Sequence, residues 1–153
     1  MQTNKFLWAA CLLGLLMLSC KGEDGRDGQD GLDANFEVFN MTAMDASWVP
    51  SSDTQGLNTL YQASFSVPEL TEYICDNGLV TCYHVYSDGV QAPLPVVRWF
   101  EDQDGNRWSE VYDFEYQPGT LTVFFTVSDF YYVGSPGDQQ FRLVLSWAGE
   151  KNR

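Results

Sequence analysis

Apolar and polar residues alternate along most of the chain after residue 35, a pattern that is typical of β-strands with one buried face. The clearest example lies near the end of the chain, where the residues expected to point inward are Phe141, Leu143, Leu145 and Trp147. Proline, glycine and asparagine residues interrupt the pattern at short intervals and indicate turns. The pattern therefore predicts an all-β domain of antiparallel strands.

The spacing of about seven predicted strands favours a single antiparallel β-sandwich, Ig-like or jelly-roll-like, over a barrel. The strands are expected at residues 36–46, 61–67, 79–86, 96–101, 107–117, 120–128 and 140–147. A polar loop is expected at residues 51–58. Pro93 and Pro95 place the strand that follows them at a sheet edge, because proline cannot donate a hydrogen bond to a ladder.

Two connections have a predicted geometry of their own. Residues 69–76 are expected to form a helical turn, which Asp76-Asn77-Gly78 would end in a left-handed backbone conformation. Asp104-Gly105-Asn106 is typical of a hairpin turn between two strands.

The beginning of the chain differs from the rest, and residues 1–19 have the pattern of an export signal. Lys5 precedes an apolar run from Phe6 to Leu18, which is too short to cross a hydrocarbon layer of about 30 Å. Cleavage after Ser19 would leave Cys20 at the new N-terminus, an arrangement that resembles the lipobox of bacterial lipoproteins. The resemblance implies acylation of Cys20, with palmitate for example, and stable anchoring by two or three chains. An ordinary cleaved signal with an incidental cysteine is the alternative.

Residues 20–33 form an acidic spacer with glycine at positions 22, 25, 28 and 31. This Gly-X-Y spacing resembles collagen, although the run contains no proline. Because its like charges repel one another, we expect an extended, solvated linker, with a trimeric stalk as the alternative. The acidic run directly after Cys20 also resembles the tags that send some Gram-negative lipoproteins to the cell surface.

The bulk properties limit the remaining classes of function. The full chain carries a net charge of −13, so phosphate backbones should repel it and nucleic acid is not an expected partner. Residues 34–153 suit one domain, and their many aromatic residues are sufficient for a packed core. We expect this domain to be monomeric.

Taken in order, several segments resemble a family of small Gram-negative lipoproteins with a short collagen-like spacer. They are the lipobox, the spacer, Pro68-Glu69-Leu70-Thr71, Asp76-Asn77-Gly78 with residues 80–86, Pro93-Leu94-Pro95, and residues 141–145. The resemblance implies a β-domain anchored to the bacterial outer membrane and facing the periplasm or the cell surface. It brings no catalytic residues to this chain.

Cys75 and Cys82 are the cysteines of the predicted domain, and they lie on either side of a turn. An exported protein meets an oxidising compartment, so a disulfide and two buried free thiols are both open readings. His84 would share a strand face with Cys82, which raises the alternative of a hydrolytic Cys-His pair. No third orienting residue is evident, so a structural histidine is the expected role.

The acidic residues suggest two further kinds of site. An oxygen-rich turn that could attract Ca²⁺ is formed by Asp102, Asp104 and Asn106. It does not match an EF-hand loop, which has its glycine at the sixth position, because Gly105 comes directly after Asp104. We therefore expect a solvated turn, with no metal and no cofactor. Asp113 and Glu115 share a strand face, which we expect to be exposed to solvent. The alternative is that the two carboxylates act as the catalytic pair of a hydrolase.

Aromatic residues near predicted loops are the candidates for ligand contact: Trp99, Trp108, Phe130, Tyr131 and Tyr132. If several of them form one exposed platform, carbohydrate stacking is favoured; if they are buried, they belong to the core. We expect a membrane-anchored, non-enzymatic binding or structural module of the cell envelope. A glycan or another envelope protein would be its partner.

Overall fold

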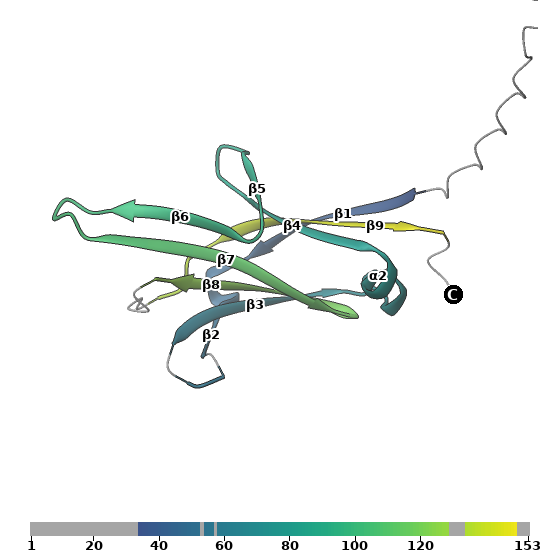
Figure 1. Cartoon of the computed structure of the whole chain (residues 1–153), viewed down its shortest axis with the longest axis horizontal. Helices are drawn as coiled ribbons and strands as arrows, with labels where there is room; N and C mark the ends of the chain where they lie inside the picture. Colours follow the sequence, from purple (N-terminus) through teal and green to yellow (C-terminus); the bar gives the residue numbers. More distant parts are fainter. Residues whose placement is uncertain (1–33, 53, 57, 129–133, 150–153) are drawn as a thin grey trace, which may run out of the picture. The chain divides into compact units, whose positions relative to one another are not determined.

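The computed structural model of the protein describes residues 34–52, 54–56, 58–128 and 134–149, all within one compact unit (Figure 1). These residues form two antiparallel sheets that pack face to face, which confirms the predicted all-β sandwich. Within the described residues, no helix has the length and apolar character needed to cross a membrane.

The first sheet has four strands in the order β1-β9-β4-β5. They are β1 (Ala34–Ala43), β9 (Gln139–Ala148), β4 (Leu79–Val85) and β5 (Gln91–Pro93). β1 pairs with β9 along its whole length, from Ala34 opposite Ala148 to Ala43 opposite Gln139. This register defines two ends of the sheet, and we call them the tether end (Ala34 and Ala148) and the pocket end (Ala43 and Gln139).

The second sheet has five strands in the order β2-β3-β8-β7-β6. They are β2 (Val49–Ser52), β3 (Thr59–Val67), β8 (Gly119–Val127), β7 (Arg107–Gln117) and β6 (Val96–Glu101). As the prolines predicted, β6 lies at a sheet edge, and the turn at residues 102–106 joins it to β7 in a hairpin.

The core lies between the two sheets and is built from alternate residues of each strand. In β8 the inward residues are Leu121, Val123, Phe125 and Val127, and the predicted inward set of β9 is buried as well. Aromatic rings connect the sheets, since the ring of Tyr112 in β7 is tilted against Phe125 of its own sheet and against Phe141 of the other. The alternation seen in the sequence is therefore the alternation of core and solvent.

Helix α2 (Glu72–Asn77) covers the core at the tether end. Thr71 caps the helix by accepting a hydrogen bond from the Ile74 N–H, and the Ile74 side chain is completely buried. The Tyr73 hydroxyl donates to the carbonyl oxygen of Ala148 at 2.7 Å, which attaches the helix to the last residue of β9.

The end of α2 differs from the prediction of a left-handed turn. Gly78 has a φ of −98° and a ψ of −179°, which is extended backbone that any residue can adopt. Glycine is needed there for space instead, because a Cβ atom would lie 2.7 Å from the Ile74 carbonyl oxygen and 2.9 Å from that of Ser146.

The described residues form nine strands, where about seven were predicted. The strand predicted at residues 36–46 ends at Ala43, and the short 3-10 helix η2 (Asp45–Ser47) carries the chain to β2 in the other sheet. Trp48 is buried beside this crossing, and its indole N–H donates to the Gly137 carbonyl oxygen at 2.9 Å. The predicted loop at 51–58 also begins later, because Ser51 and Ser52 pair with β3.

Candidate functional site

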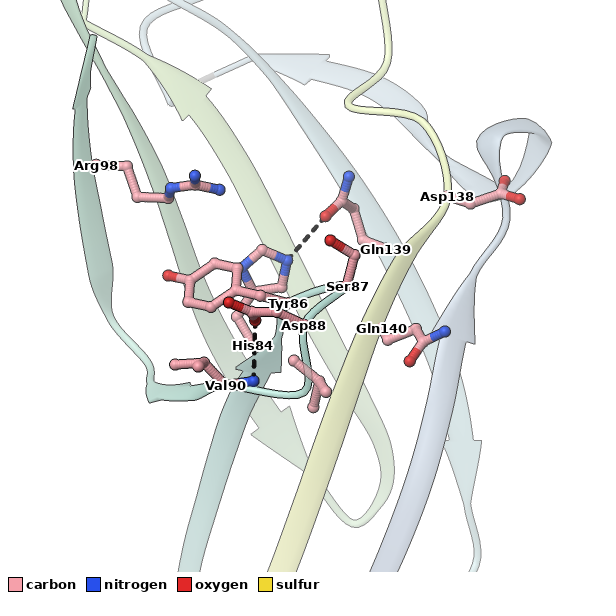
Figure 2. Close-up of a pocket in the computed structure, with 10 residues that line it drawn as sticks. His84, Tyr86, Ser87, Asp88, Val90, Arg98, Asp138, Gln139 and Gln140 are labelled. Carbon is pink, nitrogen blue, oxygen red and sulfur yellow. Dashed lines mark hydrogen bonds between the residues drawn. The ribbon is translucent and has the colours of Figure 1, made fainter.

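A pocket of about 490 Å³ lies at the pocket end of the sandwich, between the edges of the two sheets. Its walls come from the end of β4, the turn at residues 86–90, β6 of the other sheet and the start of β9, as Figure 2 shows. The side chains of His84, Arg98 and Gln139 approach one another there from three different strands.

His84 reaches this position because it continues the inward row of β4 after Val80 and Cys82. The side chain is only 2% exposed. Its ring stacks on Tyr112 at a centroid distance of 4.5 Å and lies edge-on to Tyr86 at 4.7 Å. His84 is thus a wall residue that aromatic rings hold in one orientation.

Gln139 fixes the hydrogen bonding of His84. The Gln139 amide Nε2 donates to the Pro136 carbonyl oxygen at 2.7 Å, so its Oε1 is the atom that faces His84. Because an amide oxygen only accepts, His84 Nε2 must donate across the 2.8 Å contact. The other ring nitrogen, Nδ1, is buried and has no hydrogen-bond partner.

The surroundings of His84 favour its neutral form. Burial lowers the pKa of His84 because the charged imidazolium would lose hydration, and the nearby Arg98 charge lowers it further. The hydrogen bond with Gln139 acts in the opposite direction and does not reverse the shift. A neutral His84 leaves Arg98 as the cation among the pocket walls.

Arg98 comes from β6, where residues 96, 98 and 100 face inward. Its guanidinium carbon lies 4.8 Å from the centre of the Tyr86 ring and 5.2 Å from that of Phe100. These cation–π contacts hold the guanidinium at the pocket, although the side chain is exposed. In the described part of the chain the one salt bridge joins Arg107 to Glu101 and does not involve Arg98.

The turn between β4 and β5 gives the pocket its floor. The Tyr86 N–H donates to the Val90 carbonyl oxygen, and Gly89 takes a φ of +83°, which favours glycine. Asp88 Oδ1 accepts from the Val90 N–H at 3.0 Å, so this carboxylate stabilises the turn.

The second acidic residue at the pocket has a similar structural contact. Asp138 Oδ1 accepts from the backbone N–H of Asp45 at 2.7 Å and so holds helix η2 against the start of β9. Neither Asp88 nor Asp138 is ion-paired with Arg98.

Both cysteines of the domain are free thiols in the structure, and of the two buried thiols that the sequence allowed as an alternative to a disulfide, only Cys82 is buried. Cys82 is completely buried on the inner face of β4, whereas Cys75 is half-buried on α2. Burial raises the pKa of the Cys82 thiol to about 12. Cys82 and His84 do share a strand face, but the thiol stays protonated at neutral pH and supplies no thiolate for a hydrolytic pair.

The two acidic candidates lie away from the pocket. Asp113 and Glu115 are exposed on the outer face of β7, opposite Phe124 and Thr122 of β8. The turn considered as a calcium candidate is closed by its own hydrogen bonds. The carboxylate of Asp102 accepts from the backbone N–H groups of residues 104 and 106 and from the Asn106 side chain.

These bonds lower the pKa of Asp102, with the Asn106 side chain as the largest cause. The described residues contain no cluster of three acidic, histidine or cysteine side chains that could hold a metal ion.

The aromatic candidates do not form one platform within the described residues. Trp99 is 78% exposed on the outer face of β6, whereas Trp108 is half-buried and stacks on Phe100 at an angle of 14° on the inner face. Phe130, Tyr131 and Tyr132 lie outside the described residues, as do Cys20 and the spacer.

Sequence reasoning missed Arg98, Tyr86 and Gln139 as members of a site. One signal was available, because Arg98 occupies the inward position between the apolar residues Val96 and Phe100. A cation at an inward position is unusual unless it is paired or reaches solvent at the edge of the core, so this position indicates a polar opening there.

Comparison of the chain with protein-family models, with curated proteins and with solved structures gave no match.

Proposed function

We propose that this protein is a lipid-anchored, non-enzymatic binding module of the bacterial cell envelope. Its lipid anchor would be Cys20, its spacer residues 20–33, and its ligand site the pocket at His84 and Arg98. The outer membrane is the proposed location, with the domain facing the periplasm or the cell surface. The lipobox and the acidic spacer support this location by resemblance.

The observation that carries the proposal is the position of the pocket relative to the strand that follows the spacer. β1 begins at the tether end and runs for 10 residues to the pocket end (Figure 1). At about 3.3 Å per residue, the pocket lies about 30 Å from Ala34. A module tethered through Ala34 would therefore carry its pocket on the end away from the attachment.

The chemistry of the pocket walls favours binding over catalysis. Arg98 and Gln139 offer charge and hydrogen bonds that can orient a ligand, and the Tyr86 ring adds an apolar surface. The imidazole Nε2 of His84 donates to Gln139, and its basic nitrogen, Nδ1, is buried out of reach of the solvent. The neighbouring Cys82 thiol stays protonated. Neither side chain is therefore available as a poised base or nucleophile.

Membrane fractionation tests the anchor. Cys20→Ala should move the protein from the membrane fraction to the soluble fraction, because it removes the thiol that would be acylated. Cys11→Ala is the matched control, since this cysteine lies inside the signal and should leave anchoring unchanged. If the Cys20→Ala protein still sediments with membranes after a high-salt wash, the anchor is wrong.

Glycan-array binding of the full chain tests the module. Glycans are the first ligands to try, because an exported protein with exposed aromatic residues meets them at the cell envelope. Tyr86→Ala removes the ring beneath Arg98, whereas Trp99→Ala removes the exposed indole on the other face of β6. Binding that is lost with Tyr86→Ala and kept with Trp99→Ala supports the pocket, and the reverse result favours an aromatic platform. No binding, combined with hydrolysis of a substrate that depends on His84, would overturn the proposal.

A further inference from the structure

We propose that the pocket recognises the carboxylate group of a small ligand, which the Arg98 guanidinium would bind through two parallel hydrogen bonds. This inference rests on the proposed function, because it names the chemical class that the binding module would recognise. Arginine suits a carboxylate since its planar fork of N–H donors matches the spacing of the two carboxylate oxygens.

The first support is the way Arg98 is held. Tyr86 and Phe100 contact the guanidinium through their ring faces, and no described residue accepts a hydrogen bond from it. Its N–H donors therefore remain available at the pocket wall. Because the aromatic rings already restrict the side chain, a ligand would order it at a smaller entropic cost.

The second support is charge pairing elsewhere in the domain. The cations of the described residues are Arg98, Arg107 and Arg142. Arg107 is paired with Glu101, and Arg142 donates to the Gln91 side chain. Among the described residues Arg98 forms no salt bridge, although Glu110 lies opposite it in the register of β7. The position is therefore open to an acidic group from outside.

The remaining walls limit the kind of anion. Asp88 and Asp138 line the same pocket and would repel a doubly charged phosphate more strongly than a single carboxylate. Each uses one carboxylate oxygen to accept a backbone N–H, and the second oxygen has no partner among the described residues. A ligand with hydroxyl or ammonium groups beside its carboxylate would find acceptors there.

His84 provides a direct readout of the site. It is the only histidine of the chain, so its imidazole gives a single resolved signal in proton–carbon NMR spectra of an untagged protein. The Arg98 charge lowers the pKa of His84. A carboxylate bound to Arg98 would offset that charge, so the titration midpoint of His84 should rise when ligand saturates the pocket.

The test is an NMR titration of the full chain in detergent at constant ionic strength, with acetate and acetamide as the matched probes. Acetate should shift the His84 signal in a saturable way, whereas acetamide, which has the same shape without the charge, should not. Inorganic phosphate should bind more weakly than acetate. Arg98→Gln should weaken acetate binding by about tenfold or more.

Two further variants separate the carboxylate contact from general effects. Arg107→Gln removes an exposed arginine of the same hairpin and should leave the acetate titration unchanged. Arg98→Lys keeps the positive charge but lacks the planar fork of N–H donors, so it should bind acetate with an affinity between those of wild type and Arg98→Gln. If Arg98→Gln does not fold, the comparison of Arg98→Lys with wild type tests the same contact.

Each other outcome overturns the inference. Equal shifts with acetate and acetamide would mean that the pocket binds without reading a carboxylate, and the proposed binding function would survive. A lack of any saturable acetate shift, or an acetate shift that Arg98→Gln leaves intact, would remove the role of Arg98. The glycan array tests the proposed binding function independently of the carboxylate contact at Arg98.

Discussion

His84 and Cys82 are neighbours on the inner face of β4, and burial holds both in their uncharged forms. For the thiol this means a raised pKa, and for the imidazole a lowered one, because each charged form would lose hydration in the core. The residue pair that resembles a catalytic dyad in the sequence is thus part of the core and its wall. Both residues allow a test of whether burial keeps their side chains uncharged.

Acidification should destabilise the fold through His84. Its folded-state pKa lies below the ordinary value of 6.5, so the unfolded chain binds more protons between these two values. The stabilisation is complete above pH 6.5 and is lost as the pH falls through the lowered folded-state pKa. The urea midpoint of wild type should therefore fall between about pH 7.5 and about pH 5.5. His84→Gln is the control, and an equal fall in this variant would contradict the assignment.

The two domain thiols should differ in reactivity. In a Cys11→Ala, Cys20→Ala chain, a thiol reagent at mild alkaline pH should label Cys75 first and leave Cys82 protected until the protein unfolds. Burial, Asp76 and Glu72 raise the pKa of Cys75, so its labelling should also be slow. Adding Cys75→Ser should leave no rapidly labelled thiol. Two thiols that appear only after chemical reduction would show that the cysteines form a disulfide.

At the scale of elements, the sequence predicts strands well where the alternation is uninterrupted. β7 has the predicted bounds Arg107–Gln117, and the inward residues of β9 are the predicted ones. The prediction fails at residues 36–46, where the chain changes sheets at η2. Alternation is a local property and says nothing about such a crossing. Similarly, Gly78 resembles a left-handed turn residue in sequence, but the nearby backbone carbonyl groups of α2 and β9 are what require it.

Gly78→Ala should therefore destabilise the protein by steric overlap. Its Cβ would meet two backbone carbonyl oxygens, which cannot move without shifting α2 or β9. We expect a loss of about 1–3 kcal/mol in the free energy of unfolding, measured by urea denaturation. Gly105→Asn is the control, because Gly105 has a φ of +81°, open space around it, and a replacement that tolerates this conformation. A smaller loss for Gly78→Ala than for Gly105→Asn would refute the steric argument.

At the scale of the whole molecule, the candidate site was beyond the reach of sequence pattern. His84, Arg98 and Gln139 belong to three strands of two sheets, and only strand order and register bring them together. The sequence could establish the class of fold because burial on one face of a strand leaves a local trace. It could not establish the pocket, because contacts between residues far apart in the chain leave none.

The sandwich should fold without the preceding segments. Its buried residues run from Ala43 to Trp147, so residues 34–153 contain the whole described core. This fragment should be soluble, rich in strand by circular dichroism and monomeric by size-exclusion chromatography with light scattering. The full Cys20→Ala chain is the reference. Loss of folding in the fragment, or a trimer that depends on the Gly-X-Y run, would show that the spacer has a structural role.

The pairing of β1 with β9 has a mechanical consequence. The spacer meets β1 at Ala34, whereas a ligand held beside Gln139 pulls on β9 from the opposite end of the same strand pair. Tension between ligand and anchor would then run along the strands and load their perpendicular hydrogen bonds together, in shear. The same tension applied between Ala34 and Ala148, which face each other, would open the pairs one after another. The antiparallel register of β1 and β9 would therefore place this strand pair in shear for any part of the load that passes from the pocket through Gln139 to the spacer.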